Sequence, residues 1–327
     1  MMFGRNQTWT GIDLGADRIK LVHGQGGQRF EKITHIGTEP WGRRASDDPV
    51  QSASAALGRL FERLDLKPKK LGHVAVTAAC PQMSVRDVAM PPMSAEELRS
   101  CLQFESRKHL DLESLDNPVV DAQIVEEATP TEDGGAGRMR VLMAAVPSSY
   151  LDFALQVVEP LGLEPEVVDL EVFASLNELF AHRPPDEARD LPLGLLNLGT
   201  ESSRLNIASR TGGVMSRVVG IGAPLEDDGD LVATYFRGLV GQIRDTLTYY
   251  RGRFRREVDE LHVAGGGAYL PGLLDTLRTE LSVEVSILDP LVDCCDTAEG
   301  LGAWQQEGAR FVTACGLCRW WDGDARV

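Results

Sequence analysis

The stretch GIDLGADRIKLV, residues 11–22, carries the strongest fold signal in the chain, because it joins two apolar runs through a glycine turn. The first run is WTGIDLG at residues 9–15, the second is RIKLVHG at 18–24, and EKITHIG follows at 31–37. Apolar runs separated by short glycine turns are typical of antiparallel strands. We therefore predict a β-meander over residues 8–38 that opens a domain.

A similar unit returns in the second half of the chain. GLLNLG at residues 194–199 is followed by SSRLNIAS at 202–209 and VMSRVVGIG at 214–222. Asp13-Leu14-Gly15 then lines up with Asn197-Leu198-Gly199. Two copies of one supersecondary unit, each starting its own half, indicate a duplicated α/β fold of two related lobes. We expect the turns of the two copies to face one another across a cleft.

The pattern of apolar and polar residues between the two meanders changes at residue 84. Before it come an amphipathic helical pattern at 47–64 and a buried strand pattern at 71–78. After it, Ser94 and Glu97 stand at capping-box spacing, and two strands and a helix follow. These patterns predict a first lobe over 1–83, an inserted α+β subdomain over 84–166, a helix back to the first lobe over 167–190, a second lobe over 191–306, and a closing helix with an acidic tail over 307–327.

The charge balance excludes several classes of partner. Lys and Arg number 33 against 49 Asp and Glu, which gives a formal net charge of -16. Such a chain repels nucleic-acid phosphates and anionic lipids, so we expect no nucleic-acid partner and membrane association only through another protein. The six cysteines are few for 327 residues, and the first residues lack the apolar stretch of a signal peptide. A cytoplasmic location is therefore expected.

Three glycine turns carry the candidate chemistry. A carboxylate before a tight turn can hold a hydrated divalent cation on phosphates, which assigns Asp13 to a metal, Gly15 to the turn and Lys20 to a phosphate. Gly265, Gly266 and Gly267 follow the strand pattern LHVA and could let the backbone approach a nucleoside. A strand–helix turn with positive φ is the alternative interpretation of these glycines. The order of the three turns favours nucleotide binding.

This combination resembles the actin-like ATPase superfamily and, within it, the PilM family of type IV pilus assembly proteins. GIDLGADRIKLV is similar to the family's first phosphate loop, LLNLGTESSRLNI to its second, and HVAGGGAYLPGL to its adenosine loop. Further similarity lies in VAMPPMSAEELRSCLQFES at 88–106, VVDLEVFASLNEL at 167–179 and RFVTACGLCRW at 310–320.

The resemblance implies an actin-like fold with a subdomain inserted in the first lobe, as in the cell-division protein FtsA. It also implies ATP and magnesium in the interlobe cleft and capture of a short cytoplasmic N-terminal peptide of the inner-membrane protein PilN. The candidate nucleotide residues are Asp13, Gly15, Lys20, Asn197, Gly199, Thr200, Gly265, Gly266 and Gly267. The candidate partner-binding residues, in the insert, are Leu102, Phe104 and Val141.

Three departures from the family pattern affect the expected nucleotide site. Asn197 stands where the family usually has Asp, and Ala16 and Asp17 replace hydroxyl residues. Only residues 223–230 separate the second meander from a long amphipathic helical pattern at 231–258, where the family usually carries extra helices. We therefore expect a degenerate nucleotide site. The chain would then be a scaffold of a type IV pilus or type II secretion-like machine that contacts a PilN-like protein and other platform components. The alternatives are an active ATPase switch in the same machine and an FtsA-like role in cell division.

Overall fold

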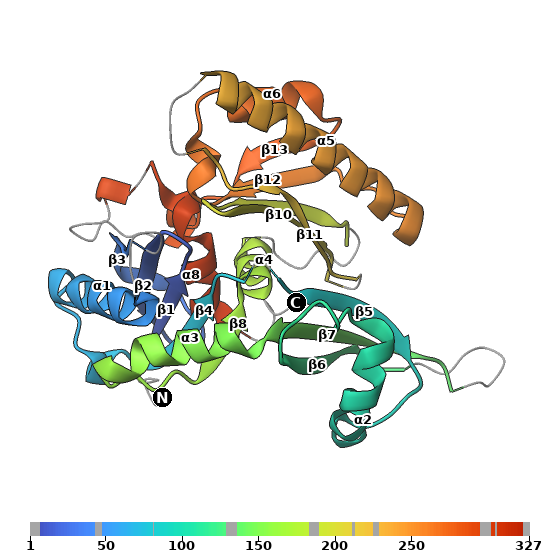
Figure 1. Cartoon of the computed structure of the whole chain (residues 1–327), viewed down its shortest axis with the longest axis horizontal. Helices are drawn as coiled ribbons and strands as arrows, with labels where there is room; N and C mark the ends of the chain where they lie inside the picture. The colour runs from blue at the N-terminus through green and yellow to red at the C-terminus, as the bar shows by residue number, and fades with distance from the viewer. Residues whose placement is uncertain are drawn as a thin grey trace.

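The computed structural model describes residues 7–42, 48–80, 82–128, 136–182, 190–210, 213–224, 229–294, 302–304 and 306–322. The predicted acidic tail lies mostly outside the described residues. In Figure 1 the first lobe lies at the lower left, the second lobe at the top, and a third sheet with its helix at the lower right.

The first lobe is built on a sheet of order β3-β2-β1-β4-β8. The predicted meander is confirmed as its antiparallel part, and β4 and β8 add in parallel. Its strands are β1 (Gln7–Leu14), β2 (Arg18–Gly26), β3 (Lys32–Pro40), β4 (His73–Ala78) and β8 (Val167–Leu170).

The second lobe repeats this order as β11-β10-β9-β12-β13. Its strands are β9 (Leu193–Leu198), β10 (Ser202–Ala208), β11 (Met215–Ile221), β12 (Glu260–Ala264) and β13 (Glu284–Ile287). In the first sheet Asp13 lies opposite Lys20, and in the second Asn197 lies opposite Arg204. The predicted duplication and the equivalence of Asp13 and Asn197 are therefore confirmed residue by residue.

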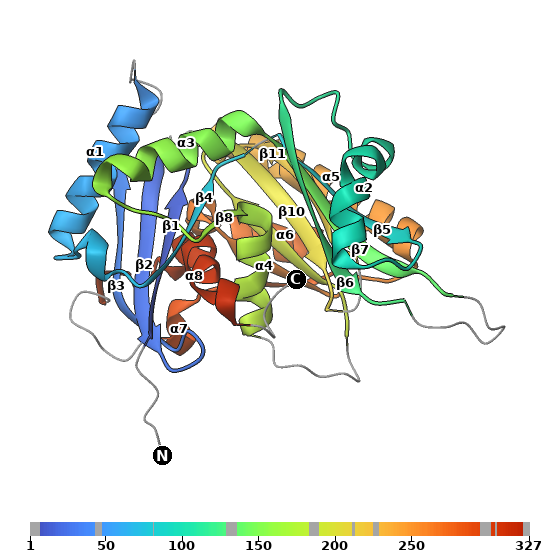
Figure 2. The same cartoon turned by 90° about the horizontal axis from the view of Figure 1, so that it is seen from below.

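Helices cover the sheets on both sides. α1 (Pro49–Arg63) and α3 (Ser148–Val158) pack on the first sheet through a core that includes Leu57, Leu60 and Val157. α5 (Gly229–Phe254) and α6 (Leu273–Glu280) cover the second sheet. α4 (Glu171–Ala181) lies between the two lobes, packed on α8 (Val312–Cys318) and on β9 and β10 (Figure 2).

The crossing of α4 and α8 depends on Gly316. A Cβ on this glycine would lie 1.7 Å from the backbone oxygen of Ala174, so only glycine fits. On the other side of α8, a Cβ on Gly11 would lie 2.0 Å from the backbone oxygen of Ala314. These two close approaches bring β1, α8 and α4 into direct contact, which places the start of α4 beside the ends of the first sheet's strands.

The insert contains a sheet of order β5-β7-β6 and one helix. The elements are β5 (Ser84–Met90), α2 (Ala95–His109), β6 (Pro118–Glu126) and β7 (Met139–Pro147). The predicted capping box is confirmed, because Ser94 Oγ accepts from the Glu97 N–H and the Glu97 side chain accepts from the Ser94 N–H. α3, which falls in the predicted range 84–166, packs on the first lobe. The boundaries of the five predicted segments stay predictions.

Two predicted helices differ from the observed elements. The long helix, expected over 231–258, ends at Phe254 because Arg255 adopts a left-handed backbone conformation with φ of 57°. The closing helix, predicted within 307–327, contains among its described residues one short α segment, α8, between two 3-10 turns, Gly308–Phe311 and Arg319–Trp321. The remaining described helix, α7, is the short segment Leu291–Cys294.

A buried histidine of the first sheet makes stability depend on pH. The Thr10 hydroxyl donates to the Leu71 carbonyl at 2.9 Å, so it accepts from His23 Nδ1 at 2.8 Å. Burial, with His35 adding to it, lowers the pKa of His23 to about 4. The unfolded chain takes up a proton near pH 6.5 and the folded chain does not, so stability falls as pH drops from about 6.5 to about 4.

We expect His23 to remove about 3 kcal/mol of unfolding free energy across this range, because each unit of pKa difference is worth about 1.4 kcal/mol. Urea unfolding of the wild type and of His23→Gln at pH 7.5 and pH 4.5 measures the effect. The wild type should lose more stability than the variant between these two pH values. An equal loss in both proteins would show that His23 does not titrate in this way.

Candidate functional site

The first predicted turn places Asp13 at the end of β1, buried between the lobes. Its carboxylate accepts a hydrogen bond from Lys20 Nζ, with 2.7 Å between Nζ and Oδ2. Lys20 lies directly opposite Asp13 in the β1–β2 ladder, so the strand register itself brings the two charges together. The carboxylate predicted to hold a metal therefore already has a cation beside it.

The equivalent position in the second lobe carries Asn197 with Arg204 opposite it. Asn197 Nδ2 donates to Oε1 of Glu171 at 2.5 Å. Arg204 is only 5% exposed, and its guanidinium donates to the carbonyl oxygen of Cys80 and the hydroxyl of Ser216, both at 3.3 Å. Because Cys80 follows β4, Arg204 reaches from the second lobe into the first.

Glu171 is a site residue that the sequence reasoning missed. It begins α4, directly after β8, and the carboxyl ends of the parallel strands β1, β4 and β8 meet at one edge of the first sheet. Burial raises the pKa of Glu171, and the nearby charge of Asp13 raises it further. The charges of Arg204 and Lys20 lower this pKa. The sequence contained one signal for Glu171, which is that it directly follows a strand. Polar residues that follow parallel strands gather at one edge of the sheet.

The backbone groups of the second predicted turn, at Gly199, form hydrogen bonds within the second lobe. The Gly199 N–H donates to the Ser202 carbonyl at 3.1 Å, and the Gly199 carbonyl accepts from the Ala223 N–H at 2.9 Å. A Cβ on Gly222 would lie 1.8 Å from the carbonyl oxygen of Thr200, so the chain after β11 packs tightly on this turn. In the first turn, the Gly15 carbonyl accepts from Trp41 Nε1 at 2.9 Å.

The triple-glycine turn packs on the second turn. Gly265 has a φ of 86°, and a Cβ there would lie 2.5 Å from the Leu198 carbonyl oxygen and 2.6 Å from Asn197 Oδ1. A Cβ on Gly267 would lie 2.8 Å from Leu198 Cβ, and one on Gly266 would lie 3.2 Å from an Arg310 nitrogen. Close packing therefore accounts for glycine at positions 265 and 267, whereas at 266 only the flexible Arg310 side chain would have to move. A 3-10 turn, Gly266–Tyr269, follows, and α6 begins only at Leu273.

These contacts bring together Asp13, Lys20, Glu171, Asn197 and Arg204, which we call the interlobe cluster. Magnesium prefers carboxylate oxygens and water, and it would have to compete with Lys20 at Asp13 and with Asn197 and Arg204 at Glu171. Among the described residues, no group of three or more His, Cys, Asp or Glu side chains is placed to hold a metal ion. In this conformation the carboxylates of Asp13 and Glu171 therefore already have cationic or amide partners.

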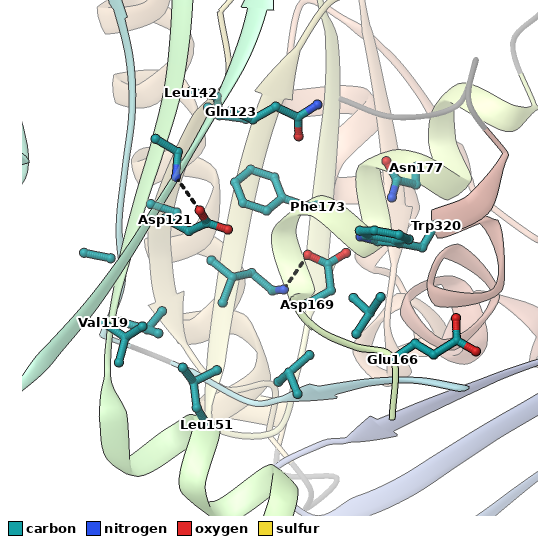
Figure 3. Close-up of a pocket in the computed structure, with 17 residues that line it drawn as sticks. Val119, Asp121, Gln123, Leu142, Leu151, Glu166, Asp169, Phe173, Asn177 and Trp320 are labelled. Atoms are coloured by element: carbon teal, nitrogen blue, oxygen red, sulfur yellow. Dashed lines mark hydrogen bonds between the residues drawn. The ribbon is translucent and has the colours of Figure 1, made fainter. Parts of the chain in front are cut away.

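A second candidate site is a groove of about 420 Å³ between the first lobe and the insert (Figure 3). One wall is a face of the third sheet, made by the cross-strand pairs Val119 with Val146, Asp121 with Ala144 and Gln123 with Leu142. The other wall is β8 and the first turns of α4, with Asp169 and Phe173. Leu151 and Trp320 also line the groove.

Comparison with protein families assigns the chain to one of them. The family model described as type IV pilus assembly protein PilM matches residues 11–225 and 222–319. The chain belongs to the PilM family. A search of curated proteins gave no match.

Solved structures share the actin-like two-lobe fold of this PilM-family chain. A PilM-PilN type IV pilus biogenesis complex has a TM-score of 0.74 at 20% identity, with 94% of this chain and 97% of that chain covered. Component A of (R)-2-hydroxyglutaryl-CoA dehydratase from Acidaminococcus fermentans has a TM-score of 0.51 at 9% identity, with 98% and 100% covered. A nucleotide-free diol dehydratase-reactivating factor has a TM-score of 0.50 at 9% identity, with 97% and 100% covered.

The three predicted partner-binding residues of the PilM-family chain lie outside the groove. Phe104 on α2 is 65% exposed, and Leu102 is partly buried in the core of the insert. Val141 is 0% exposed and belongs to the same core, so a partner cannot reach its side chain in this conformation. In the described part of the chain, every helix is too short or too polar to cross a bilayer.

Proposed function

We propose that this PilM-family chain is a cytoplasmic scaffold of a type IV pilus or related type II secretion-like machine. In this proposal it binds the cytoplasmic N-terminal peptide of a PilN-like inner-membrane protein, which attaches it to the membrane and to other platform components. The groove between the first lobe and the insert is the observation that carries the proposal. The PilN partner of the similarly folded PilM-PilN complex supports it.

The groove suits an extended peptide for two reasons. β8 is the edge strand of the first sheet, and no described strand pairs with its outer side, so its backbone can accept an added strand. The facing wall presents Val119, Leu142 and Val146, which can bury alternate apolar side chains of such a peptide. Backbone pairing would supply affinity and the apolar wall would supply specificity.

We also propose that the nucleotide site of this chain is degenerate. Lys20 and Arg204 stand in the interlobe cluster where a metal ion would otherwise neutralise carboxylates, and Asn197 contributes no charge. β11 ends at Ile221 and α5 begins at Gly229, so there is room for only a short connection where the family carries extra helices. The cluster then serves to hold the lobes together, with Arg204 on Cys80 and Asn197 on Glu171.

A synthetic peptide with the N-terminal cytoplasmic sequence of the PilN-like protein from the same organism tests the scaffold proposal. Ala144 is partly exposed in the groove wall, so Ala144→Trp should fill the groove and reduce binding in calorimetric titration at least tenfold. Phe104→Asp, on the exposed face of α2, is the matched control and should bind as the wild type does. Loss of binding in the Phe104 variant with retention in the Ala144 variant would place the partner on α2. Thermal melts of both variants exclude unfolding as the cause.

A further inference from the structure

The charges that line the groove are all of one sign. Among its 17 lining residues, Asp121, Glu166 and Asp169 are acidic, and none is Lys, Arg or His. Most of the others are apolar, so charges inside the groove are screened less than charges on the open surface. A cationic side chain of a bound peptide would therefore be attracted to this groove, and an anionic one would be repelled.

Two of the carboxylates are oriented by their own backbone. Asp169 Oδ1 accepts from the N–H of Leu170 at 2.8 Å, and Asp121 Oδ1 accepts from the N–H of Ala122 at 2.8 Å. In the view of Figure 3 the side chain of Asp169, on β8, lies between Phe173 and Trp320, which also line the groove, and the ring of Trp320 is seen edge-on. A carboxylate beside an aromatic ring is suited to a Lys or Arg side chain, because the carboxylate bonds the cation and the ring face attracts it.

Glu166 completes this acidic end of the groove from a more exposed position. Its carboxylate contacts His73 Nδ1 at 2.9 Å, and the side chain of Glu166 is about half exposed. It therefore contributes less to a bound cation than Asp169 does, since solvent screens an exposed charge. Asp169 is the lining carboxylate whose surroundings favour a strong and selective contact.

We propose that the groove selects a peptide with a basic residue and that Asp169, with Trp320 beside it, binds the cation of that residue. The inference rests on the proposed peptide-binding function and adds the chemistry of the peptide. Cytoplasmic segments next to a membrane span carry an excess of Lys and Arg, so the charge of the groove complements that of an inner-membrane protein's cytoplasmic end.

Selection from a random 12-residue phage-displayed library tests the inference and does not require the partner to be identified. Phages that bind the Ala144→Trp variant are removed first, so that the remaining binders need the open groove. We expect selection on the full-length wild type to enrich Lys or Arg at one position of the recovered peptides. Selection on Asp169→Asn, which keeps the shape and the Leu170 contact, should lose that enrichment.

The affinities of the recovered peptides for the wild type and the variants test the inference quantitatively. A selected peptide should bind Asp169→Asn 10- to 100-fold more weakly than the wild type, the range expected for a lost charge-assisted hydrogen bond. Asp121→Asn is the control on the opposite wall and should weaken the same peptide less. Groove-dependent peptides without a basic residue would overturn this inference and leave the scaffold function standing. Failure to recover any groove-dependent peptide would contradict both.

Discussion

Replacing Arg319 by methionine should lower the free energy of unfolding by about 3–5 kcal/mol, the usual effect of leaving a buried charge without its partner. Arg319 Nε lies 2.7 Å from Oε2 of Glu178, which is fully buried in α4. The same carboxylate contacts His182 Nε2 at 2.7 Å. Methionine would keep the packing of the aliphatic stem but leave Glu178 with His182 alone.

The double variant Glu178→Gln with Arg319→Met separates the charge effect from the packing effect. It removes the buried carboxylate as well, so it should recover much of the stability that the single variant loses. Urea unfolding at pH 7 measures both proteins. Equal destabilisation in the single and double variants would show that shape rather than charge controls this contact.

The contribution of the same ion pair to stability depends on pH. Burial alone would raise the pKa of Glu178, but Arg319 and His182 hold it below its ordinary value. Stability from this carboxylate is therefore present above the unfolded pKa of about 4.3 and is lost as pH falls further. Because Trp320 follows Arg319, the contact also positions one wall of the groove.

Replacing Asn197 by aspartate should destabilise the protein by about 2–4 kcal/mol at pH 8, because two carboxylates would then face each other. A like-charge pair at about 4 Å and an effective dielectric constant of 20 is unfavourable by about 4 kcal/mol. The hydrogen bond from Asn197 Nδ2 to Glu171 would also be lost. Near pH 5 the loss should be smaller, because burial and Asp13 already raise the pKa of Glu171 and a shared proton relieves the repulsion.

Magnesium and a serine variant test the origin of this effect. Excess magnesium should restore part of the stability of Asn197→Asp, since the new carboxylate pair offers the oxygen ligands that the ion prefers. Asn197→Ser loses only the hydrogen bond, about 1 kcal/mol, and should respond neither to pH nor to magnesium. An aspartate variant as stable as the wild type at pH 8 would show that residue 197 does not face Glu171.

Nucleotide titration of the same proteins addresses the degenerate-site proposal directly. The wild type should show no binding heat with magnesium and ATP. Micromolar binding that disappears in Asp13→Ala would contradict the proposal and favour an ATPase switch. A gain of magnesium-dependent binding in Asn197→Asp would locate the defect at Asn197, whereas no gain would assign it to the short connection between β11 and α5.

Much of the fold could be predicted because its signals are local. The alternation of apolar residues and the glycine turns around Asp13 and Asn197 define the two meanders, and the Ser94 capping box defines the start of α2. The closing helix could not be predicted in detail. Its apolar residues satisfy a helical period, but the 3-10 turn before α8 packs on β2, β12 and the Gly266–Tyr269 turn, and the 3-10 turn after it packs on α4.

Some residues of the candidate sites could likewise be predicted from local sequence, and others could not. Asp13 and Lys20 are seven positions apart across one tight turn, so strand register alone places them in contact. Glu171 and Arg204 lie in stretches that resemble the family, but nothing in those stretches marks them as site residues. Their contacts with Asn197 and Cys80 depend on how the two lobes pack together. Val141 belongs to an apolar strand pattern that has two faces, and the pattern does not tell which face packs on α2.

The order of residues was enough to establish the duplicated lobes, the equivalence of the two phosphate-type turns and the family to which the chain belongs. Their causes lie within short windows of the chain, where side-chain period, turn residues and cross-strand register act. Packing in three dimensions was needed to show that the interlobe carboxylates are internally compensated and that β8, α4 and the insert enclose an acidic groove. These features depend on the angle at which packed elements meet, and close approaches between residues distant in the sequence, such as that of Gly316 on Ala174, set this angle.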